Sequence, residues 1–145
     1  MIPMSPDPEI VERRLAHQRD LLRHLDTLGP IDAERLRTEP IVRAATERMM
    51  QALVDLALDL NAHVASTVLG RAPATGRESF DLMVEAKVLS PELAARLKPA
   101  VGLRNILVHM YADIDVGLVA AAVGELDVFH EYVRAVARWL LSRSP

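Results

Sequence analysis

The sequence predicts an all-α protein, a bundle of four long helices with one extra short helix. The 145 residues are rich in Ala, Leu, Arg and Glu, which favour helices, and only five are aromatic. Proline is absent from two long stretches, 41–72 and 100–144, and apolar residues recur there every three or four positions. This length fits a single domain, 1–145, in which we expect residues 1–7 to be flexible.

The first helix is expected from about Pro8 to Leu28. Asp7 is a suitable N-cap, Pro8 suits the first helical position, and Gly29-Pro30 ends the helix. The segment from Gly29 to Glu39 is polar and shows no clear periodicity, so it is expected to be a linker. The apolar residues predicted to face the core are Val11, Leu15, Leu21, Leu22, Leu25 and Leu28.

The second helix is expected from about Pro40 to Leu69, with Gly70 as its C-cap. A loop should follow over 71–78 and a short helix over 79–88, because Pro73 and Gly76 precede an apolar pattern. The stripe predicted for the second helix consists of Val42, Ala45, Met49, Leu53, Leu56, Leu60, Val64 and Val68.

Ser90-Pro91-Glu92 is typical of a helix start, and this helix should run to about Tyr111 with an interruption or kink at Pro99. The last helix should begin at Asp115 or Gly117 and end near Ser142. Its expected apolar stripe is Leu118, Ala122, Leu126, Phe129, Val133, Val136 and Leu140. Long helices joined by short connections predict a helical bundle.

Composition excludes several classes of protein. The absence of Cys removes disulfides, thiol nucleophiles and thiolate zinc sites, and the formal net charge of −3 argues against binding nucleic acid by bulk charge. No basic-then-apolar leader occurs, and no apolar run approaches the roughly 18 residues of a membrane span. We therefore expect a cytoplasmic protein without a metal or a cofactor, since no phosphate-binding glycine loop is present.

The segment from Arg104 to Tyr111 carries the candidate chemistry. On a helix, Arg104 and Tyr111 share one stripe, and Asn105 and His109 share the adjacent stripe. Cleavage of RNA through its own 2′-hydroxyl needs proton transfer, which His performs near neutral pH, and a cation for the phosphate, which Arg supplies. One helix supplies only one His, so a two-fold dimer would be needed to supply the second proton-transfer group.

This segment resembles the R-x4-H-x-Y signature of the HEPN superfamily, in its HepT-like toxin branch. The stretches 51–64, 78–82 and 88–90 are similar to other parts of that family, so the resemblance covers most of the chain. It implies an up-and-down HEPN-type bundle, a homodimer, and a metal-independent endoribonuclease toxin. Arg104 and His109 would be the catalytic pair, and Asn105 would support them.

The resemblance also implies a partner, a small MntA-type nucleotidyltransferase that acts as antitoxin by transferring AMP to Tyr111. An anionic adduct there would compete for Arg104 on the same stripe. Members of the family often have Glu between the His and the Tyr, whereas this chain has Met110.

Other polar residues allow two interpretations each. Asp59 could orient His109 or contact RNA, or it could form an exposed pair with His63. His17 and His24 lack a metal-binding pattern, His130 is expected at the rim of the core, and the arginines near Glu34 are expected in a solvated loop. The alternative to an enzyme is a non-catalytic helical dimer that binds a nucleotidyltransferase partner or RNA.

Overall fold

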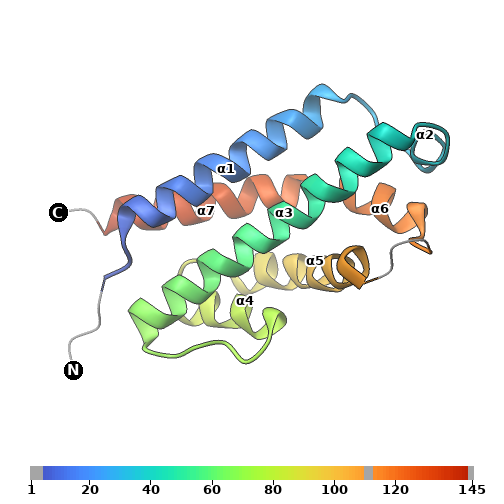
Figure 1. Cartoon of the computed structure of the whole chain (residues 1–145). Coiled ribbons are helices and arrows are strands. Elements are labelled where there is room, and N and C mark those ends of the chain that lie inside the picture. The colour runs from blue at the N-terminus through green and yellow to red at the C-terminus, as the bar shows by residue number, and fades with distance from the viewer. Residues whose placement is uncertain (1–4, 110–112, 144–145) are drawn as a thin grey trace.

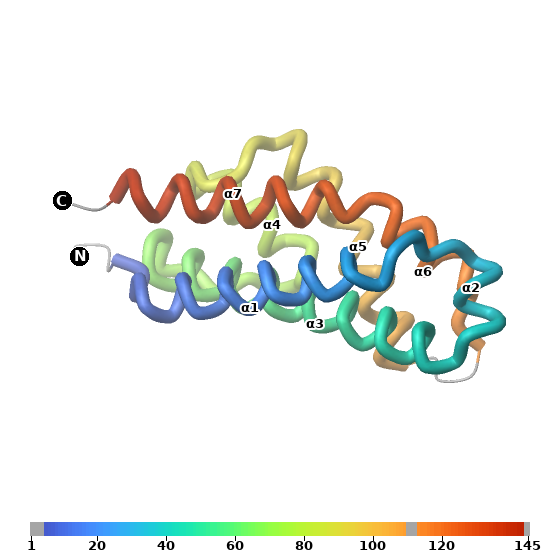
Figure 2. Tube along the Cα trace, turned by 90° about the horizontal axis from the view of Figure 1, so that it is seen from above, coloured from blue at the N-terminus to red at the C-terminus, as the bar shows by residue number. Residues whose placement is uncertain are grey.

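The computed structural model describes residues 5–109 and 113–143, and over these ranges the chain is all-α. The four long helices are α1 (Pro8–Thr27), α3 (Pro40–Val64), α5 (Pro91–His109) and α7 (Asp127–Ser142). Both α1 and α5 pack on α3 and on α7, which closes a four-membered ring. Consecutive long helices run in opposite directions (Figures 1 and 2), so the predicted up-and-down four-helix bundle is confirmed.

The predicted helix ends are confirmed where capping residues mark them. The Asp7 carboxylate accepts a hydrogen bond from the Glu9 N–H at 3.0 Å, and the Ser90 hydroxyl accepts one from the Leu93 N–H at 3.1 Å. The Asp115 carboxylate caps α6 (Val116–Val123). Gly70 has a φ of +67°, the left-handed conformation that ends a helix. It follows a π-helical turn, η1 (Ala65–Leu69), which prolongs α3 to the predicted end.

Three predicted connections are wrong. The expected linker contains α2 (Ala33–Thr38), because the Asp32 carboxylate caps it and Leu36 is buried. The expected loop over 71–78 ends early, since α4 (Gly76–Glu85) begins at its Thr75 cap. The single last helix is two, α6 and α7, separated by a turn at residues 124–126. By contrast, α5 runs through Pro99 as one helix.

The break before α7 also changes which residues face the core. Leu118, predicted to be buried, is 50% exposed, and Val119 is buried in its place. In α3 the predicted stripe is partly wrong: Ala45, Met49 and Leu56 are only partly buried. The fully buried positions include Met50, Val54, Ala57 and Asn61. α3 packs on α1, α2, α4 and α5, so a single apolar stripe does not describe its buried surface.

A buried polar network joins three helices of the core. The Tyr132 hydroxyl donates to Asn61 Oδ1 at 2.7 Å, and Asn61 Nδ2 donates to Ser79 Oγ at 3.0 Å. Burial raises the pKa of Tyr132, so this hydroxyl stays protonated and keeps its donor. The network holds α7, α3 and α4 in one register, because an unpaired buried polar group is costly.

Within the described residues, one helix, spanning 40–69, is long and apolar enough by composition to cross a membrane. This differs from the prediction that no segment approaches such a span. The packing of four other helices on it accounts for its apolar character, because several of its apolar side chains are fully buried in the core.

Candidate active site

The predicted catalytic segment forms the last turns of α5, and its arginine is held by a carboxylate of α3. Arg104 Nε donates to Asp55 Oδ1 at 2.7 Å, and the two side chains are 31% and 35% exposed. Among the described residues, no acceptor is bonded to the two terminal nitrogens of Arg104. The guanidinium is thus fixed through one edge, while its fork remains available to an anion such as phosphate.

Asn105 and His109 are exposed at the same end of α5. They follow Gly102 by three and seven positions, so the three residues share one side of the helix. A Cβ at Gly102 would lie 3.5 Å from a terminal nitrogen of Arg77, the second residue of α4. Arg77 therefore places a second guanidinium beside the face that carries Asn105 and His109.

Sequence reasoning missed Asp55 and Arg77 as members of this cluster. Asp55 interrupts an apolar run in the middle of a core helix, and a charged residue there is a signal of a specific partner. Gly102 inside a helix is a signal of a close approach by another group. Tyr111, the predicted site of AMP attachment, lies outside the described residues, as does Met110.

Asp59 and His63, predicted as an alternative pair, have other partners. Asp59 is exposed, and its nearest cation is Arg14 of α1, at 4.0 Å. His63 Nε2 accepts a hydrogen bond from the Asp7 N–H at 3.0 Å. This bond ties the start of α1 to α3. Asp7, the last residue of the segment expected to be flexible, therefore takes part in two hydrogen bonds, one with His63 and one with the Glu9 N–H. A supporting role for Asp59 toward His109 stays a prediction.

The remaining polar candidates lie away from Arg104. His17 and His24 are exposed on α1, and His130 is exposed on α7. Arg35 and Arg37 belong to α2, where each pairs with a glutamate of the same segment. In the part of the chain that the structure describes, no three His, Asp or Glu side chains are grouped as ligands of one metal ion.

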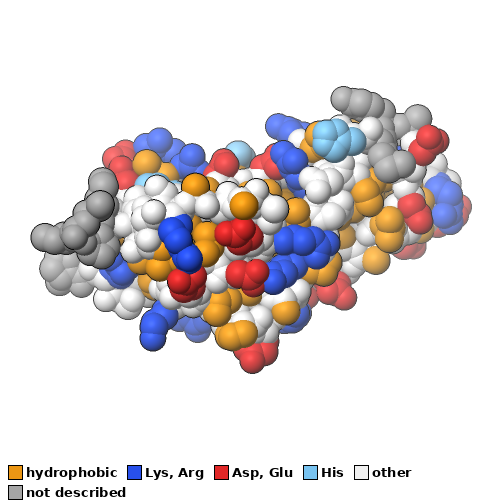
Figure 3. Space-filling view, turned by 90° about the horizontal axis from the view of Figure 1, so that it is seen from below, with side chains coloured by type: hydrophobic (Ala, Val, Ile, Leu, Met, Phe, Trp, Pro, Cys, Tyr) orange, Lys and Arg blue, Asp and Glu red, His pale blue; other side chains and the backbone are white. Residues whose placement is uncertain are grey.

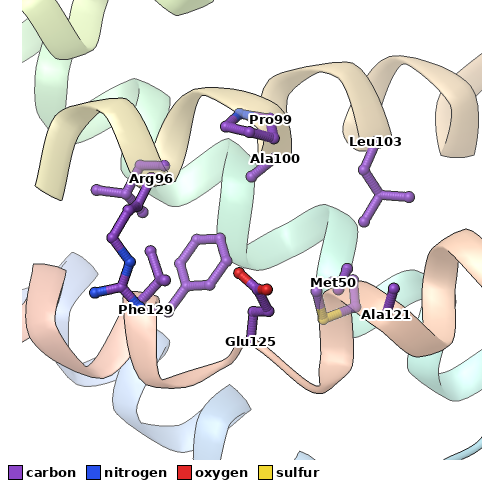
Figure 4. Close-up of a pocket in the computed structure, with 11 residues that line it drawn as sticks. Met50, Arg96, Pro99, Ala100, Leu103, Ala121, Glu125 and Phe129 are labelled. Carbon is purple, nitrogen blue, oxygen red and sulfur yellow. The ribbon is translucent and has the colours of Figure 1, made fainter. Parts of the chain in front are cut away.

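An apolar cavity of about 350 Å³ lies between α5 and the junction of α6 with α7 (Figure 4). Leu103, Ala100 and Phe129 line it, with Arg96 and Glu125 among them. Arg96 bonds Asp127 and Glu131, each at 2.9 Å, and the hydrogen bond to Asp127 raises the pKa of Arg96. Two carboxylates already neutralise this arginine, so the cavity lacks the free cation and the imidazole that phosphodiester cleavage needs.

The surface around the cluster carries charges of both signs. On the face seen from below the bundle, Lys and Arg side chains are interspersed with Asp and Glu, and apolar side chains lie between them (Figure 3). Recognition of an anion at this face therefore depends on a few placed groups rather than on a broad positive field.

Comparison with known proteins identifies the family of this chain. The family model described as "Ribonuclease HepT-like" matches residues 15–136. The chain belongs to the HepT-like ribonuclease family. It is 33% identical, over 94% of its length and 93% of the relative's, to a protein of Aphanizomenon flos-aquae named tRNA nuclease HepT. It is 29% identical, over 62% of its length and 65% of the relative's, to a protein of Shewanella oneidensis named mRNA nuclease HepT.

Solved structures show that the HepT-like chain has the fold of HEPN toxins. One of them is the tri-AMPylated HEPN toxin of Shewanella oneidensis in complex with its MNT antitoxin. The TM-score is 0.79 at 21% identity, covering 89% of this chain and 97% of that one. The up-and-down arrangement of α1, α3, α5 and α7 is therefore shared over nearly the full length of that toxin.

Proposed function

We propose that this HepT-like protein is an endoribonuclease toxin of a toxin–antitoxin pair that cleaves RNA without a metal ion. The observation that carries the proposal is the arrangement at the end of α5. Asp55 anchors Arg104 through Nε, the terminal nitrogens of Arg104 have no acceptor among the described residues, and Asn105 and His109 are exposed on the same last turns of the helix. The match to the HepT-like family model over residues 15–136 supports the same function.

The proposed reaction uses the 2′-hydroxyl of the RNA as nucleophile. One His109 imidazole takes the 2′-hydroxyl proton, and the 2′-oxygen attacks phosphorus. The bond from phosphorus to the 5′-oxygen breaks, and a second imidazole donates a proton to that oxygen. The products are a 2′,3′-cyclic phosphate and a 5′-hydroxyl. Arg104 stabilises the charge that develops on the phosphoryl oxygens, and Asn105 orients the imidazole or the phosphate.

A homodimer supplies the second imidazole in this proposal. A two-fold axis close to the end of α5 would bring two copies of Arg104 and His109 to one cleft. Exposure of His109, rather than burial in the bundle, is compatible with such a shared site. We propose that the dimer acts on RNA in the cytoplasm.

The proposed antitoxin is an MntA-type nucleotidyltransferase that transfers AMP to Tyr111. The HEPN toxin of Shewanella oneidensis that shares this fold is tri-AMPylated in its complex with an MNT antitoxin, and this supports the proposal. The adduct would add a negative phosphate close in sequence to Arg104 and His109, and it would occupy the arginine that the substrate needs.

The test is cleavage of RNA by the purified protein in the presence of EDTA. We expect cleavage that leaves 2′,3′-cyclic phosphate ends, and we expect Arg104→Ala and His109→Ala each to lower the rate at least a hundredfold. Thermal unfolding of both variants should stay close to the parent, because His109 is exposed and the one-third exposed ion pair of Arg104 contributes about 1 kcal/mol at most. His24→Ala, an exposed histidine of α1 that lies outside the proposed site, is the matched control and should cleave normally.

Full activity of either variant at Arg104 or His109 would overturn the catalytic assignment. Loss of all cleavage in EDTA, restored by a divalent cation, would overturn the metal-independent reaction. RNA that is bound but never cut, by parent and variants alike, would instead support the non-catalytic dimer that binds RNA or a nucleotidyltransferase.

A further inference from the structure

A groove between α1 and α7 carries a concentration of positive charge on an otherwise acidic chain. The two helices run alongside each other (Figure 2), and a hollow of about 470 Å³ lies between them. Arg19 and Arg23 line it from α1, and Arg134 and His130 line it from α7. We call this set the α1/α7 groove. Three guanidinium groups face one carboxylate there, Asp26, whereas the whole chain has a net charge of −3.

Two of the three arginines have no carboxylate partner in the part of the bundle that the structure describes. Over residues 5–109 and 113–143, no carboxylate lies within 4.0 Å of the side-chain nitrogens of Arg19 or Arg134. Arg23 has one partner, Asp20, its neighbour on α1, at 2.5 Å. This differs from Arg96, which two carboxylates neutralise. Guanidinium groups brought together without counterions repel each other, so an anion placed among them would be favoured.

The rest of the groove limits what that anion can be. Its remaining lining is aliphatic, Leu22 and Val133, and among the residues that the structure describes no aromatic ring lines it on which a base could stack. At one end the groove meets an adjoining hollow that is lined by Asp26 and Asp127 and, within the described ranges, by no Lys or Arg. The region that attracts an anion therefore stops there. The groove therefore suits a short run of phosphates read without regard to base sequence.

We propose that the α1/α7 groove binds the phosphate backbone of the RNA substrate at a distance from the reacting linkage. This inference rests on the proposed ribonuclease function and extends it. Arg104 belongs to the α3/α5 side of the bundle, whereas the groove lies between α1 and α7, so the two sites contact different parts of one RNA. Contacts to several phosphates would explain how an acidic protein holds a polyanion.

The test measures RNA binding in a background that cannot cut. In His109→Ala protein, a fluorescent single-stranded RNA of about 30 nucleotides is titrated at several salt concentrations, with anisotropy as the readout. Arg19→Gln, Arg23→Gln and Arg134→Gln combined should weaken binding about tenfold and lower the salt slope by about 2, since roughly 0.7 counterions are released per phosphate contact. All three arginines are exposed, so the triple variant should fold.

The matched control removes the same charge elsewhere: Arg13→Gln, Arg37→Gln and Arg71→Gln, all exposed arginines of α1, α2 and the loop before α4. It should bind within twofold of the parent. Equal binding by groove variant and control would overturn the groove assignment while leaving cleavage by the parent, and hence the proposed function, intact.

Two further outcomes separate the proposals. RNA binding that depends on the groove in a parent protein that never cuts would keep the groove and overturn the enzyme. A polyglutamate peptide that displaces RNA from the parent at lower concentration than unlabelled RNA does would assign the groove to an acidic protein segment and overturn the RNA assignment.

Discussion

The Asp55–Arg104 pair is a contact of small energetic weight that fixes the direction of a proposed catalytic group. Both side chains are about one-third exposed, and such pairs contribute between zero and about 1 kcal/mol to stability. Their effect on orientation is larger. A guanidinium anchored through Nε presents its two terminal nitrogens in a fixed direction, and catalysis is sensitive to shifts of about 1 Å in the groups that bind the phosphate.

We predict that Asp55→Asn lowers kcat/KM for RNA cleavage about tenfold, because the amide holds Arg104 less tightly than the carboxylate. Steady-state cleavage assays measure this. The thermal unfolding temperature should change little, which separates positioning of Arg104 from a structural role. Asp81→Asn is the control, since Asp81 pairs at 2.6 Å with Lys98, six residues before Arg104 on α5, and should leave cleavage unchanged.

Asp59→Asn, assayed in parallel, decides between the two acids of α3. A loss at Asp59 with none at Asp55 would support the sequence-based expectation for Asp59 and contradict the positioning role of Asp55.

Arg104, Asn105 and His109 could be predicted from the motif because they lie close together on one helix. Asp55 is 49 residues from Arg104, and their contact depends on how α3 packs against α5.

At the scale of the elements, two glycines show how closely the helices around the site approach one another. A Cβ at Gly76, the first residue of α4, would lie 3.0 Å from a methyl group of Val101 and 3.3 Å from one of Leu58. A Cβ at Gly102, within α5, would meet only the end of the flexible Arg77 side chain, at 3.5 Å. Glycine is required for packing at the first position and not at the second.

Gly76→Ala should therefore destabilise the protein by about 1–2 kcal/mol, because α4 must move away from α3 and α5. Gly102→Ala should stabilise it by about 0.5–1 kcal/mol, since alanine favours the helix interior. Denaturant unfolding of the two variants provides the comparison. Stabilisation by Gly76→Ala would show that the three helices are less closely packed than the structure indicates.

The turn between α6 and α7 and the short helix α2 leave little signal in the apolar pattern of the sequence. Residues 124–126 follow the strongly apolar Val116–Val123, so apolar periodicity continues through the turn and conceals it. The six residues of α2 are too few to show a period, and their helix depends on the Asp32 cap and the burial of Leu36. A tertiary contact, the burial of Leu36, thus contributed to α2, whereas the turn at 124–126 was concealed by the apolar pattern itself.

At the scale of the whole molecule, a shared active site predicts that an inactive protomer disables its partner. A mixed dimer of parent and His109→Ala protein would hold a single imidazole in the cleft, whereas the proposed reaction uses two. Refolding the parent with a threefold excess of His109→Ala protein should therefore lower cleavage per parent protomer to about a quarter. Refolding the parent with the same excess of His24→Ala protein is the control. Full activity per parent protomer, with mixed dimers demonstrated by mass spectrometry, would contradict a shared site.

The proposed regulation by the antitoxin predicts a covalent change of defined mass at Tyr111. With ATP and the cognate nucleotidyltransferase, the peptide that contains Tyr111 should gain the mass of AMP, and RNA cleavage should fall in parallel because the adduct competes for Arg104. Tyr111→Phe protein should stay unmodified and active toward RNA. Modification of Tyr132 instead is not expected, since its hydroxyl is buried and bonded to Asn61. An adduct confined to another residue would contradict the role of Tyr111.

Local information in the sequence determined the class of fold, the ends of most helices and the motif on α5, because prolines, caps and apolar periodicity act within a few residues of one another. The packing of the bundle decided the remainder: the anchoring of Arg104 by Asp55, the buried network of Tyr132 and Asn61, and the grouping of arginines between α1 and α7. Each of these joins helices that are far apart in the chain, and only the folding of the bundle brings such side chains within a few ångströms of each other.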